Sequence, residues 1–279
     1  MALPIALAVL ACAAALDPSG TARAQEGYAF QQLQALAQDS ARRPRAEAPP
    51  VGGGRALPAA PGSEAVGSYV SGRLNRAARL PPAGDGFVKI ERRRGRAWGT
   101  DELAAALQAI GARYRKAFPD GARVQIGDLS GKNGGTITLH KSHTNGLDAD
   151  IALAAAGERE QDPEREGFDR DFVENGRLSG DFDAAANWEL ARAAAAQPLV
   201  ERLFVAPEVK ALFCRLHGAE PESRDALRIL RPAAHHSDHY HLRLRCPAGD
   251  RRCVPQAPVA EGTGCDGIGA LGEELDSPD

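Results

Sequence analysis

Residues 239–245 alternate between two kinds of side chain, and this pattern predicts a β-strand with two unlike faces. One face would be apolar and would carry Tyr240, Leu242 and Leu244. The other would be polar and would carry His239, His241, Arg243 and Arg245. The two histidines would lie about 6.7 Å apart along the strand. Such a strand needs a core for its apolar face, so the chain must build a sheet that leaves the histidine face accessible.

A second alternating segment, residues 147–153, carries two carboxylates on one face. Its apolar positions are Leu147, Ala149, Ile151 and Leu153. Asp148 and Asp150 fall on the opposite face, where paired carboxylates are costly unless they are solvated, paired or bound to a cation. Asn145-Gly146 predicts a tight turn before the strand, which can bring His143 back towards Asp150.

The histidines cluster in these two regions. Six of the seven are His140, His143, His235, His236, His239 and His241. Neutral imidazole and carboxylate are ligands that zinc takes in proteins, and three protein ligands plus water is the plan of a catalytic zinc site. If both strands share a sheet, Asp150 and His241 face a common cleft, and His239 lies beside the metal. The alternative is a histidine-rich surface patch that binds metal adventitiously.

The remaining elements predict an α+β fold with a mostly antiparallel central sheet that carries the site and is flanked by helices. Strands are predicted at 87–91, 123–127 and 200–205, and helices at 101–118, 184–196, 207–216 and 224–230.

The N-terminal region predicts export. Met1–Leu16 is an uncharged apolar run, too short to span a bilayer and similar to the core of a secretory signal peptide. Ala22-Arg23-Ala24 predicts cleavage after residue 24, while Cys12 in a lipobox-like context is the less favoured alternative, a lipoprotein anchor. No later run is long enough to cross a membrane.

Composition divides the rest of the chain. Residues 25–64 are rich in Ala, Pro and Gly and predict a flexible tether, 65–265 the folded domain, and 266–279 an acidic tail. The net charge of -3 and the lack of a basic recognition helix argue against a nucleic-acid partner.

Four cysteines remain after Cys12, which in an exported chain suggests two disulfides with three pairings open. Cys246 and Cys253 are the natural local pair, which leaves Cys214 with Cys265. A cysteine zinc site is the competing interpretation, but no Cys-x-x-Cys spacing supports it.

The ordered motifs resemble a known family. Ser142-His143-x-x-Gly146-x-Asp148-x-Asp150 and the block 236–247, which contains His239-x-His241, resemble the lysostaphin, D-Ala-D-Ala carboxypeptidase and hedgehog group of zinc peptidases. Within that group the resemblance is closest to the penicillin-insensitive murein endopeptidases. It extends from about residue 64 to 265 and includes Gly127-Asp-Leu-Ser130.

This resemblance implies a role for each histidine of the cluster. His143, Asp150 and His241 would hold Zn²⁺, with His140 as a further candidate ligand. His239 would be the catalytic base or transition-state donor, and His236 would orient it or tune its charge.

The resemblance also implies a substrate and a place of action. The protein would be a periplasmic D,D-endopeptidase that hydrolyses D-alanyl–meso-diaminopimelate cross-links of peptidoglycan. A D,D-carboxypeptidase of the same zinc group, or a cell-wall-binding module without turnover, are the alternatives.

Overall fold

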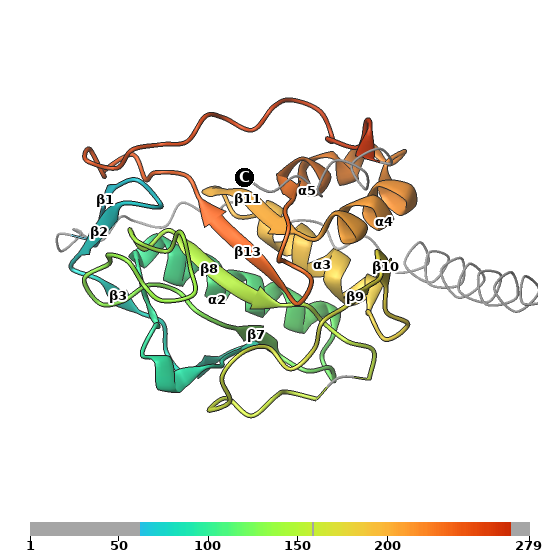
Figure 1. Ribbon diagram of the computed structural model, residues 1–279, viewed down its shortest axis with the longest axis horizontal. Coiled ribbons are helices and arrows are strands. Elements are labelled where there is room, and N and C mark those ends of the chain that lie inside the picture. Colours follow the sequence, from blue (N-terminus) through green and yellow to red (C-terminus); the bar gives the residue numbers. More distant parts are fainter. Residues whose placement is uncertain (1–61, 158, 269–279) are drawn as a thin grey trace, which may run out of the picture. The chain divides into compact units, whose positions relative to one another are not determined.

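A computed structural model describes residues 62–157 and 159–268 and contains a seven-stranded mixed sheet (Figure 1). In spatial order its strands are β12 (Leu230–Pro232), β11 (Val200–Val205), β13 (His239–Leu244), β8 (Asp148–Ala152), β7 (Val124–Ile126), β5 (Phe87–Lys89) and β4 (Ala83–Gly84). Neighbours are antiparallel except for the β12–β11 and β5–β7 pairs. The predicted α+β class with a mostly antiparallel sheet is therefore confirmed.

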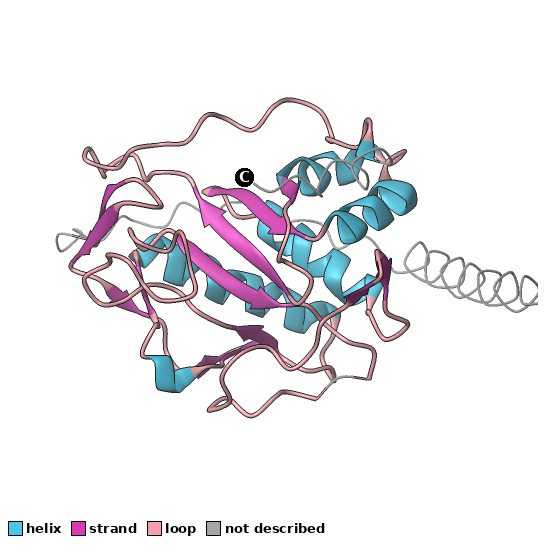
Figure 2. Cartoon of the chain, in the orientation of Figure 1, coloured by secondary structure: helices cyan, strands magenta, loops and turns pink. Residues whose placement is uncertain are grey.

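Strand β13 separates the core of the domain from the polar face of the sheet. Its side chains at Tyr240, Leu242 and Leu244 are fully buried in the hydrophobic core. Figure 2 shows α2 (Asp101–Ala117) and α3 (Ala184–Ala195) behind the central strands. The alternation of residues 239–245 thus has the predicted consequence that the histidines lie on the face opposite the apolar core.

Local signals explain where the helices begin and end. The Thr100 side chain accepts a hydrogen bond from the Leu103 backbone N–H at the start of α2, and Asp183 caps α3 in the same way. Helix α4 (Pro207–His217) begins at a proline, which suits the first helical turn. Helix α5 spans Arg224–Ile229, and two short 3₁₀ turns cover Arg92–Arg94 (η1) and Pro221–Ser223 (η2).

Several short strands were not predicted. They form three two-stranded pairs: β1 (Glu64–Gly67) with β2 (Gly72–Asn75), β3 (Ala78–Arg79) with β6 (Trp98–Gly99), and β9 (Val173–Glu174) with β10 (Arg177–Leu178). Strand β12 begins at Leu230, which the helical pattern placed at the end of α5. There the backbone becomes extended and pairs in parallel with β11.

Two disulfides fasten the C-terminal part of the chain. Cys214 is bonded to Cys265 and Cys246 to Cys253, as predicted. A buried ammonium group strengthens the first connection, because Lys210 Nζ donates hydrogen bonds to the backbone oxygens of Leu227 and Thr263, each at 2.6 Å. The segment that follows β13 is thereby tied to α4.

The predicted signal peptide (1–24), nearly all of the tether (25–64) and most of the acidic tail (266–279) lie outside the described residues. Within the described ranges, none of the helices combines the length and hydropathy that a membrane span requires. The first described residues are already anchored, since the Ser63 backbone N–H donates to Asp101 Oδ1 at 2.8 Å.

Candidate metal centre

Asp150, on β8, lies at the meeting point of four histidines. Its Oδ1 atom is 3.3 Å from His143 Nε2, 3.5 Å from His241 Nδ1 and 3.7 Å from His239 Nε2. Its Oδ2 atom is 3.7 Å from His140 Nδ1. The register of β8 and β13, which pairs Asp150 with His241, explains this convergence.

The turn before β8 places His143. Gly146 has a φ of 80° and His143 itself a φ of 65°, both in the left-handed region, so the chain folds back sharply. The His143 backbone N–H donates to Asp148 Oδ2 at 2.9 Å, which closes the turn. Its ring Nδ1 donates to the Leu129 backbone oxygen at 2.9 Å, and this leaves Nε2 directed at Asp150.

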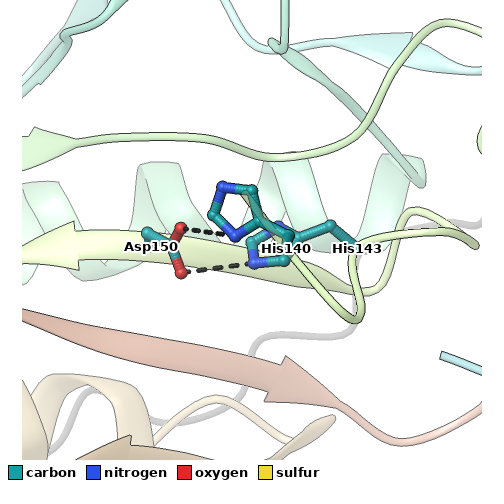
Figure 3. A group of neighbouring side chains, drawn as sticks. All are labelled: His140, His143 and Asp150. Atoms are coloured by element: carbon teal, nitrogen blue, oxygen red, sulfur yellow. Dashed lines mark ion pairs between the residues drawn. The ribbon is translucent and has the colours of Figure 1, made fainter. Parts of the chain in front are cut away.

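Two atoms of this cluster lack the partners that buried polar atoms normally have. His143 Nε2 and Asp150 Oδ1 are both buried without a hydrogen bond, although they lie 3.3 Å apart (Figure 3). His140, His143 and Asp150 each offer a ligand atom within 4.8 Å of the others. Unpartnered buried polar groups are costly, and two nitrogens with a carboxylate oxygen suit a divalent metal ion. The cluster therefore fits a metal ion.

His241 reaches the cluster through a fixed ring orientation. Its Nε2 atom is 3.1 Å from Asp148 Oδ1, so its Nδ1 atom is the one that faces Asp150. Asp148 is itself held by Arg243, whose Nε donates to Oδ1 at 2.6 Å. This buried ion pair neutralises Asp148 and makes it a support for His143 and His241.

His140 is oriented from the other side of the cluster. Its Nε2 atom is 3.1 Å from Asp128 Oδ2, which also accepts hydrogen bonds from Arg94 Nη1 at 2.9 Å and Arg96 Nη1 at 2.7 Å. Asp128 is fully buried. A carboxylate behind the imidazole fixes the orientation of the ring, which is a common arrangement behind metal-binding histidines.

His239 and His236 form the rim of the cluster on β13 and the turn before it. His239 Nδ1 is 2.5 Å from Asp238 Oδ1, which leaves Nε2 directed towards Asp150. The ring centroid of His236 lies 4.9 Å from that of His239. His236 Nδ1 donates to the Ala234 backbone oxygen at 2.6 Å.

The charges of the cluster are strongly coupled. Burial disfavours the charged form of His143, but the Asp150 carboxylate outweighs it and raises the pKa of His143 to about 9. Burial likewise opposes ionisation of Asp150, yet His143 and His239 hold the pKa of Asp150 well below its usual range. Burial, together with the charge of His239, lowers the pKa of His236 to about 4, so this ring is neutral near pH 7.

The structure brings together all six residues that the sequence predicted for the site, namely His140, His143, Asp150, His236, His239 and His241. The predicted return of His143 towards Asp150 and the common face of His239 and His241 are both confirmed. His217 is not part of the cluster, because it stacks on Trp188 with centroids 4.1 Å apart.

Three residues around the site were missed. Asp128 lies in the Gly127–Ser130 motif, which carried the family resemblance but no assigned role. Asp238 directly precedes His239 and could have been noticed as an acid beside a candidate base. Phe168, which stacks on His239, comes from a loop without periodicity and gave no sequence signal.

The chain is similar to known proteins over most of the described domain. The family model described as penicillin-insensitive murein endopeptidase matches residues 65–271. A protein of that name from Haemophilus influenzae is 34% identical over 207 residues, which cover 72% of this chain and 70% of the relative. Proteins of the same name from Klebsiella pneumoniae and Salmonella arizonae are 30% and 32% identical, and each alignment covers 73% of this chain and 74% of the relative. The chain belongs to the penicillin-insensitive murein endopeptidase family.

Proposed function

We propose that this protein is a zinc-dependent D,D-endopeptidase that hydrolyses D-alanyl–meso-diaminopimelate cross-links of peptidoglycan. Family membership supports a peptidoglycan endopeptidase, because the relatives carry that name. The observation that carries the proposal is the convergence of His143 Nε2 and His241 Nδ1 on the buried Oδ1 of Asp150. Two imidazoles and one carboxylate form a donor set that zinc uses in catalytic sites.

The orientation of each side chain favours one ligand set. His143, Asp150 and His241 would hold the metal, since His143 Nε2 and His241 Nδ1 are the ring nitrogens nearest to Asp150 Oδ1, at 3.3 and 3.5 Å. His140 faces Oδ2 and is fixed by Asp128, so it is a further candidate ligand or a polar wall of the site. A bound zinc ion supplies a Lewis acid that polarises the scissile carbonyl and lowers the pKa of water.

The protein's own groups would handle the proton. With Nδ1 held by Asp238, His239 has only Nε2 available on the metal side. From there it would accept a proton from the attacking water or donate a hydrogen bond to the developing oxyanion. His236, neutral and next to His239, would orient that ring.

The place of action is also part of the proposal. An apolar leader ending near residue 24 and two disulfides in the domain support a periplasmic protein, since disulfides persist in that oxidising compartment.

The experiment that tests the chemistry is digestion of purified sacculi with and without a chelator, with products identified by mass spectrometry. We expect cross-linked muropeptide dimers to be converted into monomers. Chelation should abolish this conversion, and added zinc should restore it. Loss of only a terminal residue from uncross-linked peptides would identify a carboxypeptidase. Binding to sacculi without any product would identify a module without turnover.

Three variants on β8 and β13 test the residue roles. His241→Ala and Asp150→Ala should lose zinc and activity together, because a ligand is removed. His239→Ala should retain zinc and lose activity by about 10²–10⁴-fold. Stoichiometric zinc in His241→Ala, or loss of zinc in His239→Ala, would contradict the ligand assignment.

A further inference from the structure

A strap of chain, residues 161–172, runs from η1 to the turn before β13 and is hydrogen-bonded at both ends and in the middle. Backbone hydrogen bonds join Arg92 N–H to the Pro163 oxygen at 3.0 Å and Phe172 N–H to the Ser237 oxygen at 2.9 Å. Its middle is held by a buried carboxylate, since Gly167 N–H donates to Glu91 Oε1 at 2.9 Å.

The strap presents one aromatic ring to the candidate base. Phe168 stacks on His239 with ring centroids 5.0 Å apart and ring planes 16° from parallel. Because Asp238 holds the Nδ1 edge of the same imidazole, the ring is fixed both at one edge and on one face. Only the Nε2 edge remains, and it points to Asp150 at 3.7 Å.

Gly127 provides the space in which Phe168 lies. A Cβ atom at position 127 would be 2.8 Å from Phe168 Cζ and 3.0 Å from Glu91 Oε2. The backbone of Gly127 is not in the left-handed region, so its conformation does not require glycine. Glycine is required at position 127 because Phe168 and Glu91 approach so closely that a side chain would not fit.

Phe168 contributes little to the hydrophobic core. The described hydrophobic residues that are buried in the core or packed against it include Phe172 and Phe182 of the same region, but not Phe168. It is half-buried, and its aromatic contact is with His239. Its position is therefore better explained by what it does to the imidazole than by the stability of the fold.

We propose that Phe168 is a positioning residue, which holds the plane of His239 so that Nε2 faces the reacting centre. This inference rests on the proposed role of His239 as base or donor. A shift of about 1 Å in a reacting group can reduce a rate by about 10²-fold, so orientation of this ring matters. Glu91 and Gly127 serve the same purpose, one by anchoring the strap and the other by leaving room for the ring.

The first test is Phe168→Ala, measured for zinc content, melting temperature, kcat and KM on a cross-linked muropeptide dimer. We expect kcat to fall by about 10–100-fold and KM to change by less than about threefold, with zinc and melting temperature retained. Phe118→Ala is the matched control, because Phe118 packs on Tyr114 at the end of α2. It should leave kcat unchanged. An unchanged kcat in Phe168→Ala would overturn the proposal.

A double variant separates positioning from a general structural effect. If Phe168 acts through His239, then Phe168→Ala should cause no further loss in a His239→Ala background. An equal loss in both backgrounds would show that Phe168 acts elsewhere. Full activity in His239→Ala alone would instead refute the role of His239, so failure of the proposed function and failure of this inference give different results.

Gly127→Ala provides an independent perturbation of the same contact. Its new methyl group should displace the Phe168 ring and lower kcat while zinc is retained. In a Phe168→Ala background the same substitution should have a much smaller effect, because only the contact with Glu91 Oε2 at 3.0 Å remains. A full additional loss there would mean that Gly127 does not act through Phe168 and would contradict this part of the proposal.

Discussion

Removal of the Cys214–Cys265 disulfide should destabilise the protein more than removal of Cys246–Cys253. The cysteines of the first bridge are 51 positions apart and those of the second 7. The loop-closure relation gives entropy changes of about 14 and about 8 cal/mol/K, which correspond to about 4.1 and about 2.4 kcal/mol at 25 °C. The expected difference is therefore about 1.7 kcal/mol in the free energy of unfolding.

The comparison uses Cys214→Ala/Cys265→Ala and Cys246→Ala/Cys253→Ala, so that neither protein carries a free thiol. All four side chains are half-buried, which makes the lost packing similar in the two variants. Urea unfolding should be evaluated as free energies with a fitted m-value, because opening a loop also exposes more of the unfolded chain. Melting temperatures should fall by about 8–16 °C and about 5–10 °C, respectively.

Equal losses, or a larger loss for the short bridge, would refute the reasoning. Either result would mean that residual structure in the unfolded chain, or contacts of the folded tail, dominate over loop closure.

Three further predictions concern charged groups. Burial, with Arg231 nearby, lowers the pKa of Lys210 to about 8, so between about pH 8 and 10.5 the unfolded state binds more protons than the folded state. The free energy of unfolding of the wild type should therefore rise with pH in this window relative to that of Lys210→Met, as measured by urea unfolding. Asp238→Asn should weaken the hold on His239 Nδ1 and lower kcat by about 10–100-fold with zinc retained, and an unchanged kcat would rule out this support. Arg243→Met should cost about 3–5 kcal/mol, because it leaves the fully buried Asp148 carboxylate without its cation; a loss below about 1 kcal/mol in urea unfolding would contradict this.

The sequence predicted the parts of the fold whose signals are local. Alternation identified β8 and β13, and capping and periodicity identified α2, α3 and α4 with boundaries within two residues of the structure. Strand β12 was missed, because its extended conformation depends on pairing with β11 and its first residue, Leu230, continues the helical pattern of α5. Pairs of two-residue strands such as β3 and β6 depend on tertiary contacts in the same way.

The site residues also differ in whether a local sequence signal or a tertiary contact places them. Residues on the two alternating strands could be assigned to one face from the sequence, and Asn145-Gly146 indicated the turn that returns His143. Asp128 could not be assigned, because its contact with His140 depends on a loop that folds back over the sheet. Phe168 comes from a distant segment whose path is determined by hydrogen bonds to Glu91 and Ser237.

The pairing of β8 with β13 has a consequence for how an active molecule is made. Asp148 and Arg243, which support the centre, are 95 positions apart, and β13 lies in the middle of the sheet between β8 and β11. Contacts between residues so far apart in the sequence form late in folding, because the intervening chain must first be closed into a loop. A nascent or truncated chain that ends before residue 239 lacks the central strand and, with it, His241, one of the three proposed metal ligands. Hydrolytic competence should therefore appear only once nearly the whole domain has been synthesised and folded.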